Sequence, residues 1–145
     1  MKIFLSFGAI IVIGLFFAGC SKPSGSIIDA GSMTATLGGA SFTAASCYEN
    51  VLVGTTESYY IQGTGTVSNT FVVLKLRGSR LHTGNYDINS DNTAWYIRDN
   101  ATFYARSGTI TINSDSAGIA TNGSFNFVVN SGATAQGSFR AVFQR

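Results

Sequence analysis

The chain has 145 residues with nine Lys or Arg and seven Asp or Glu, so its formal net charge is +2. Charged residues make up only 11% of it, against about 25% in an ordinary globular domain. The near balance of charge excludes an electrostatic nucleic-acid binder, which would carry a strong basic excess.

The first residues have the order of a bacterial lipoprotein signal. Lys2 supplies a positive charge, residues 3–17 form an apolar run, and the small residues Ala18 and Gly19 come directly before Cys20. The run is shorter than the about 20 residues of a spanning helix, although an uncleaved anchor is the alternative. We expect a helical signal peptide over residues 1–19, cleavage before Cys20, and acyl chains such as palmitate on Cys20.

Two or three acyl chains hold a protein on a membrane firmly. We therefore expect a lipoprotein of the cell envelope that is bound to its membrane without crossing it. Ser21 follows Cys20 where an Asp would favour the inner membrane, so the outer membrane is expected, with the periplasmic or outward orientation left open. Residues 20–31 are rich in serine and glycine and predict a flexible tether, and residues 32–145 form the domain.

From residue 32 onward, short alternating segments are separated by turn residues, and no window has the apolar period of a helix. Residues 33–37 and 41–45 flank Gly38-Gly39, which suits the turn of a β-hairpin. Residues 49–56 predict a loop or a weak strand. The strand predicted over residues 71–77 is the most apolar, and we expect its leucines to point inward and Lys75 and Arg77 to lie in water.

Two similar segments follow, Trp95-Tyr96-Ile97-Arg98 and Phe103-Tyr104-Ala105-Arg106. A one-residue slip in their pairing would move every side chain to the opposite face. A two-residue loop, 99–100, would pair Trp95 with Tyr104, whereas a three-residue loop, 99–101, keeps both arginines off the core. We expect the longer loop, with Trp95, Ile97, Phe103 and Ala105 inward and with Tyr96, Arg98, Tyr104 and Arg106 outward.

The last part of the chain predicts a strand over residues 108–113 and a closing hairpin. This hairpin contains a second repeat, Gly123-Ser124-Phe125 and Gly137-Ser138-Phe139, with its loop near residues 130–132. The whole pattern predicts an all-β domain, a single antiparallel β-sandwich or flattened barrel of about eight to ten short strands. The connections are too short for helical crossovers, which favours antiparallel order.

Several segments resemble a known family. They are Thr34-Ala35-Thr36-Leu37-Gly38-Gly39, Phe42-Thr43-Ala44, Gly84-Asn85-Tyr86, residues 107–112 and residues 123–127. With the signal before Cys20, they resemble a family of small all-β lipoproteins of unknown function found mainly in Bacteroidota. The resemblance rests on turn glycines and core aromatics and implies no catalytic residue.

Residues that could carry chemistry are sparse. His82 is the single histidine, with Ser79 and Asp87 nearby in sequence, but no nucleophile-elbow motif is present. A zinc site usually takes three or four His or Cys ligands, and this sequence does not supply such a set. Lipidation of Cys20 would leave Cys47 without a disulfide partner, so we expect Cys47 to be a small buried hydrophobe.

Residues 87–92 place oxygen ligands at alternating positions, as a calcium loop does, but Arg98 occupies the position of the closing glutamate. The alternative is an Asx turn between strands. We expect no catalytic residue, no metal site and no cofactor.

The best candidate binding face consists of Tyr96, Arg98, Tyr104 and Arg106. Outward tyrosines and arginines would suit a glycan or an envelope protein, whereas the alternative is that cross-strand tyrosines only stabilise the sheet. The sequence therefore favours a non-catalytic, lipid-anchored binding or structural module. The alternatives are a lipocalin-like carrier of a small apolar ligand, if the interior leaves a cavity, and an envelope hydrolase, if His82 lies beside an acid in a pocket.

Overall fold

The computed structural model describes residues 29–52, 57–67, 69–78 and 81–144. The expected signal helix at 1–19, the lipidation site Cys20 and the tether as far as residue 28 lie outside these residues. In the part of the chain that is described, no helix has the length and hydropathy needed to span a membrane.

The described residues form nine β-strands and no helix, which confirms the all-β prediction. The strands are β1 (Ser32–Leu37), β2 (Ala40–Leu52), β3 (Ser58–Gly65), β4 (Phe71–Arg77), β5 (Gly84–Asp87), β6 (Thr93–Arg98), β7 (Ala101–Ser116), β8 (Ala120–Val129) and β9 (Thr134–Phe143).

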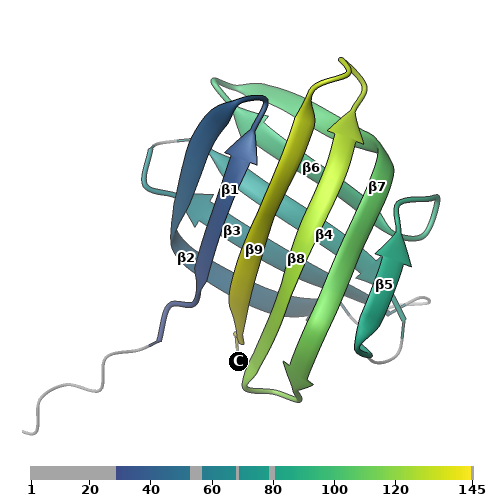
Figure 1. Ribbon diagram of the computed structural model, residues 1–145. Coiled ribbons are helices and arrows are strands. Elements are labelled where there is room, and N and C mark those ends of the chain that lie inside the picture. The colour runs from purple at the N-terminus through teal and green to yellow at the C-terminus, as the bar shows by residue number, and fades with distance from the viewer. Residues whose placement is uncertain (1–28, 53–56, 68, 79–80, 145) are drawn as a thin grey trace, which may run out of the picture.

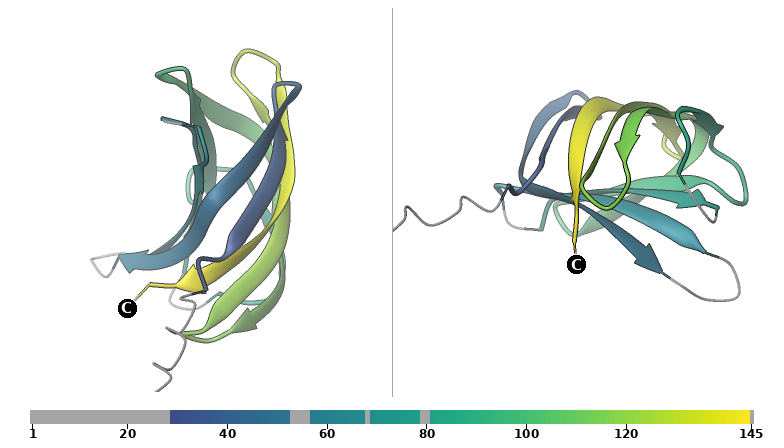
Figure 2. Two further views of the ribbon diagram at one scale, coloured as in Figure 1. Left: turned by 90° about the vertical axis from the view of Figure 1, so that its left-hand side faces the viewer. Right: turned by 90° about the horizontal axis from the view of Figure 1, so that it is seen from below.

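Eight of these strands close into an antiparallel barrel in the order β1-β2-β3-β4-β6-β7-β8-β9. β5 stays outside the ring and pairs with the second half of β7. Figure 1 shows β1, β9, β8 and β7 in front of β3, β4 and β6, and Figure 2 shows the two curved walls from the side and from below. Apart from β1 and β9, which close the ring, and β4 and β6, which are joined through β5, neighbours in the ring are consecutive in sequence and short connections join them.

The expected hairpins are present. Gly38 and Gly39 have φ angles of 56° and 86° and form the β1–β2 turn, because glycine enters this left-handed region without a Cβ clash. The β8–β9 hairpin turns after Val129, also as expected. The prediction of a loop or weak strand over residues 49–56 was too cautious, since β2 continues to Leu52 and residues 53–56 lie outside the description.

Large apolar side chains fill the barrel interior. Leu74 and Leu76 of β4 are fully buried, while Lys75 and Arg77 on the same strand point outward, as predicted. Cys47 is buried with a free thiol, also as predicted, and this burial raises the pKa of the thiol to about 12. Other fully buried side chains are Met33, Leu37, Ile61, Val72, Tyr96, Ile110, Ile112, Phe127 and Val129.

The repeated Gly-Ser-Phe segment explains how β8 and β9 pack so closely. The register pairs Gly123 with Phe139 and Phe125 with Gly137, so each phenylalanine lies opposite the glycine of the other segment. A Cβ on Gly123 would lie 2.5 Å from Cζ of Phe139 and 2.2 Å from the Thr111 carbonyl oxygen. The missing side chain of Gly123 therefore makes room for the Phe139 ring and for β7. At Gly137 it makes room for β1, since a Cβ there would lie 2.3 Å from the Thr34 carbonyl oxygen.

Replacing Gly123 with alanine should destabilise the barrel by about 1–3 kcal/mol, because backbone and ring must move to admit the methyl group. Urea unfolding of the purified protein would measure this loss. The neighbouring Ser124→Ala is the control, because Ser124 is not among the buried core residues. Equal unfolding midpoints for the two variants would contradict the packing argument.

Candidate functional site

The β6–β7 connection is a two-residue turn, so the expected three-residue loop is wrong. Arg98 pairs with Ala101, and Asp99 and Asn100 between them have φ angles of 53° and 62°. Asp and Asn enter this left-handed region more readily than most residues, and such a turn matches the twist of a hairpin. The longer loop would keep Arg98 off the core, but the inward Arg98 is not a buried charge, since its side chain remains partly exposed.

The shorter turn exchanges the faces expected for β6. Tyr96 is only 1% exposed and stacks on Phe103 inside the barrel at a centroid distance of 4.7 Å, so its predicted outward position is wrong. Trp95 and Ile97 belong to the outer surface instead of the core. The inward positions of Phe103 and Ala105 are confirmed, since both pack against the core.

The four residues of the expected binding face are therefore not brought together. Tyr104 and Arg106 are exposed, as expected, whereas Tyr96 and Arg98 lie on the inner side of the wall. Arg98 avoids burial of its charge because it lies at the end of the barrel, where its side chain remains 32% exposed. Its Nη1 donates a hydrogen bond of 2.7 Å to the Leu37 carbonyl oxygen, and its Nε lies 3.7 Å from Asp99.

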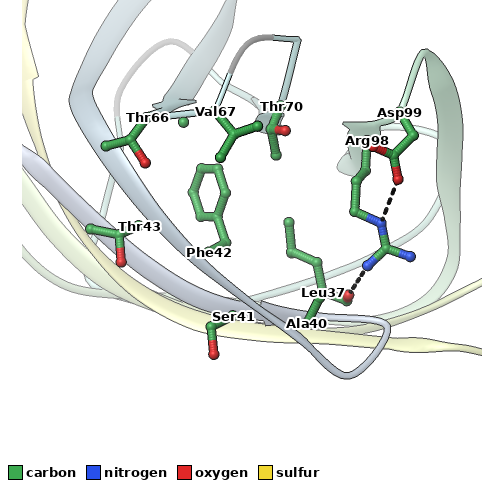
Figure 3. Close-up of a pocket in the computed structure, with 11 residues that line it drawn as sticks. Leu37, Ala40, Ser41, Phe42, Thr43, Thr66, Val67, Thr70, Arg98 and Asp99 are labelled. Atoms are coloured by element: carbon green, nitrogen blue, oxygen red, sulfur yellow. Dashed lines mark hydrogen bonds and ion pairs between the residues drawn. The ribbon is translucent and has the colours of Figure 1, made fainter.

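Arg98 borders a cavity of about 180 Å³ at this end of the barrel (Figure 3). Leu37 and Phe42 form part of the apolar wall, and Val67 lies at the rim with 70% of its surface exposed. Figure 3 shows the Arg98 guanidinium held between Asp99 and the Leu37 carbonyl. Both contacts fix the arginine within the protein, which indicates that it links the β6–β7 turn to the β1–β2 hairpin.

A larger surface feature lies on the outside of the wall formed by β2, β3, β4, β6 and β7. Directly paired residues in an antiparallel sheet share one face. The register therefore aligns a central row across the five strands: Tyr48, Gln62, Val73, Trp95 and Tyr104. The row on one side holds Ser46, Thr64, Phe71, Ile97 and Thr102, and the row on the other holds Asn50, Tyr60, Lys75 and Thr93.

Six large side chains in these rows lie outside the core cluster and are at least partly exposed, and together they form what we call the aromatic face: Tyr48, Tyr60, Phe71, Trp95, Ile97 and Tyr104. Val73 in the central row is buried, with 7% of its surface exposed. Trp95 and Tyr104 lie side by side, with ring centroids 6.3 Å apart, and Tyr104 is 57% exposed. The sequence missed this face because β6 carries apolar residues on both sides. The Asp99-Asn100 turn was the signal that could have revealed it.

The charged side chains on and beside the aromatic face are positive. The three rows contain Lys75, whose Nζ lies 5.9 Å from the centre of the Tyr60 ring, and no Asp or Glu. Exposed Arg106 follows Tyr104 by two residues and forms no ion pair with a described residue. Arg77, near the edge of the face, is paired with Asp91 at 2.5 Å.

A buried carboxyl group lies at the opposite end of the barrel. Glu49 is 5% exposed, and the Thr121 hydroxyl lies 2.5 Å from its Oε2 and 3.1 Å from Oδ1 of Asp115. Burial, and to a lesser degree the Asp115 charge, raise the pKa of Glu49, although the hydrogen bond from Thr121 opposes the shift. The Thr121 hydroxyl carries a single hydrogen, so it can donate to only one of the two carboxyl groups at a time.

The other sequence candidates occupy ordinary turns. His82 is exposed, and its backbone N–H and C=O bond to the Tyr86 hydroxyl. Ser79 lies outside the described residues. Asp87 accepts a hydrogen bond from Thr109, so the described contacts do not join it to His82.

The Asx-turn interpretation of residues 87–92 is confirmed, because Asn89 Oδ1 accepts hydrogen bonds from the backbone of Asp91 and Asn92. Asp91 is engaged with Arg77. Among the described residues, no three His, Cys, Asp or Glu side chains are grouped closely enough to hold a metal ion.

Comparisons with known proteins identify no relative of this chain. The scan against protein-family models finds no match, and the searches of curated proteins and of solved structures find none either. The resemblance to the small all-β lipoproteins stays a prediction.

The two arginines of the repeat should differ in their effect on stability. Arg98→Met removes the hydrogen bond to the Leu37 carbonyl and should lower the free energy of unfolding by about 1–2 kcal/mol. Arg106→Met removes an exposed charge and should change it by less than about 0.5 kcal/mol. Chemical unfolding of both variants tests this, and equal losses would contradict the inward position of Arg98.

Glu49 should make folding pH-dependent. Its pKa is raised in the folded state, so the free energy of unfolding should fall as the pH rises above the ordinary value of 4.5 and through the raised value, where burial opposes ionisation. Glu49→Gln should remove this part of the pH dependence, whereas Glu57→Gln should retain it. Parallel pH profiles for wild type and Glu49→Gln would contradict the assignment.

Proposed function

We propose that this protein is a non-catalytic binding module of the cell envelope, held on a membrane by lipid on Cys20, and that it binds through the aromatic face. The observation that carries the proposal is the placement of Trp95 beside Tyr104 on the outside of the barrel. Aromatic side chains offer large contact areas and are enriched where proteins bind partners.

The size of the aromatic face supports a contact role. Single exposed apolar residues are common, but contiguous apolar patches rimmed by polar groups mark interaction sites. The six side chains of the aromatic face span five neighbouring strands, and hydroxyl and amide side chains occupy positions between them. Such a face on a closed barrel is rigid, which lowers the entropy cost of binding.

The positions of the chain ends are compatible with this arrangement. The described chain starts beside the C-terminal end of β9, away from the β1–β2 and β8–β9 turns (Figure 1). Asp29 is ion-paired with Arg140 of β9, which fixes this entry point. A lipid on Cys20 would therefore attach the barrel from that end, where the Cys47 N–H of β2 donates a hydrogen bond to the Ala30 carbonyl. Trp95 and Tyr104, by contrast, lie on β6 and β7 at the other side of the wall.

A carrier of a small apolar ligand is the weaker proposal. Closed eight-strand barrels can hold one such ligand in their interior. Here Tyr96, Phe127 and Met33 project into that interior and are fully buried, and the cavity beside Arg98 lies at the barrel end with a volume of about 180 Å³. We do not propose hydrolase activity, since the described contacts of His82 and Asp87 do not bring the two together.

A double variant, Trp95→Ala/Tyr104→Ala, should lose the envelope material that the wild-type protein retains, because it removes the two adjacent rings. The measurement is co-sedimentation of the purified full-length protein with isolated envelope polysaccharide, together with capture of envelope proteins. Ile119→Ala is the control, since Ile119 is 65% exposed in the β7–β8 turn, away from the aromatic face. Unchanged retention by the correctly folded double variant would contradict the proposal.

A further inference from the structure

We infer that the aromatic face binds an acidic polysaccharide, a chain of sugars that carry carboxylate groups. The inference rests on the proposed function and names the class of partner for the same surface. Three features of the face lead to it: the spacing of its strands, its lack of acidic side chains, and its mixture of aromatic rings with hydroxyl and amide groups.

The rows of the aromatic face run across the strands. Neighbouring strands lie about 4.8 Å apart, which is close to the advance of one sugar unit along an extended polysaccharide. A chain laid along the central row would therefore meet a new strand with each sugar, from Tyr104 and Trp95 toward Tyr48. The apolar faces of sugar rings would rest on the aromatic rings.

The polar side chains of the rows suit the edges of sugar rings. Gln62 lies in the central row between Tyr48 and Val73, and Thr93 and Thr102 belong to the rows on either side. Amide and hydroxyl groups both donate and accept hydrogen bonds, as sugar hydroxyls require. The cavity at Arg98 lies at the barrel end and is lined by other residues, so an elongated partner that lies across the face suits this surface better than a ligand enclosed in a pocket.

Charge then selects among polysaccharides. Lys75 lies within the rows and Arg106 lies next to Tyr104, and neither forms an ion pair with a described residue. The three rows contain no carboxylate that would repel an acidic partner. A sugar chain with carboxylates would therefore find complementary charge along its path, which a neutral chain would leave unused.

The test compares two probes with the same sugar backbone, polygalacturonate and its methyl-esterified form, in which a methyl ester replaces each charged carboxylate. Binding of each to the full-length protein in detergent is measured at low salt, where exposed charges are least screened. Wild type should bind polygalacturonate at least about tenfold more tightly than the ester, a difference of about 1.4 kcal/mol. Lys75→Met should reduce this preference, Tyr104→Ala should weaken binding of both probes, and Ile119→Ala should change neither.

The outcomes separate this inference from the proposed function. Equal binding of the two probes, or no binding of either, overturns the acidic polysaccharide. If the wild-type protein then captures a purified envelope protein or binds vesicles of phosphatidylglycerol, and Tyr104→Ala abolishes that binding, the aromatic face stands with a different partner. If polygalacturonate binds but Tyr104→Ala and Lys75→Met leave its affinity unchanged, both the inference and the aromatic face fail.

Discussion

The two-residue turn at Asp99 and Asn100 decides which side chains this barrel presents to its surroundings. Side chains alternate along a strand, so the register that the turn imposes on β6 and β7 assigns each of them to the interior or the exterior. The turn sends Tyr96 into the core and pairs Trp95 with Tyr104 outside. One additional loop residue would reverse these assignments, and the side chains of the aromatic face would no longer lie together on the outside.

In the opposite wall, which contains β8 and β9, the main constraint is close packing of the strands. Gly123 of β8 leaves space for the Phe139 ring, and Gly137 of β9 lets β1 approach closely, so the strands close over an interior filled with large side chains. Because the interior is occupied in this way, the proposed binding surface is on the outside of the barrel. The two sequence repeats thus have separate roles. The Gly-Ser-Phe repeat lets the strands of the barrel pack closely. The side chains of the aromatic-Tyr-apolar-Arg repeat lie partly in the core and partly on the surface.

Much of the fold could be predicted because its signals are local. Gly38-Gly39 marks a hairpin, and alternation over β4 separates buried leucines from Lys75 and Arg77. The faces of β6 could not be predicted from alternation, since Trp95, Tyr96 and Ile97 are apolar or aromatic on both sides of the strand.

Two further features depend on contacts that single-segment patterns do not contain. β7 looks like two strands because a bulge between Ala105 and Ser107 shifts its alternation, yet it is one strand of 16 residues. Glu49 is buried and hydrogen-bonded to Thr121, which lies 72 residues away in the chain.

The most direct measurement of the central claim is photo-cross-linking in intact cells from a reactive residue placed at position 104, compared with one at position 119. The account predicts cross-links to an envelope component from position 104 and none from position 119, whereas equal labelling from both positions, or none from position 104, would contradict it.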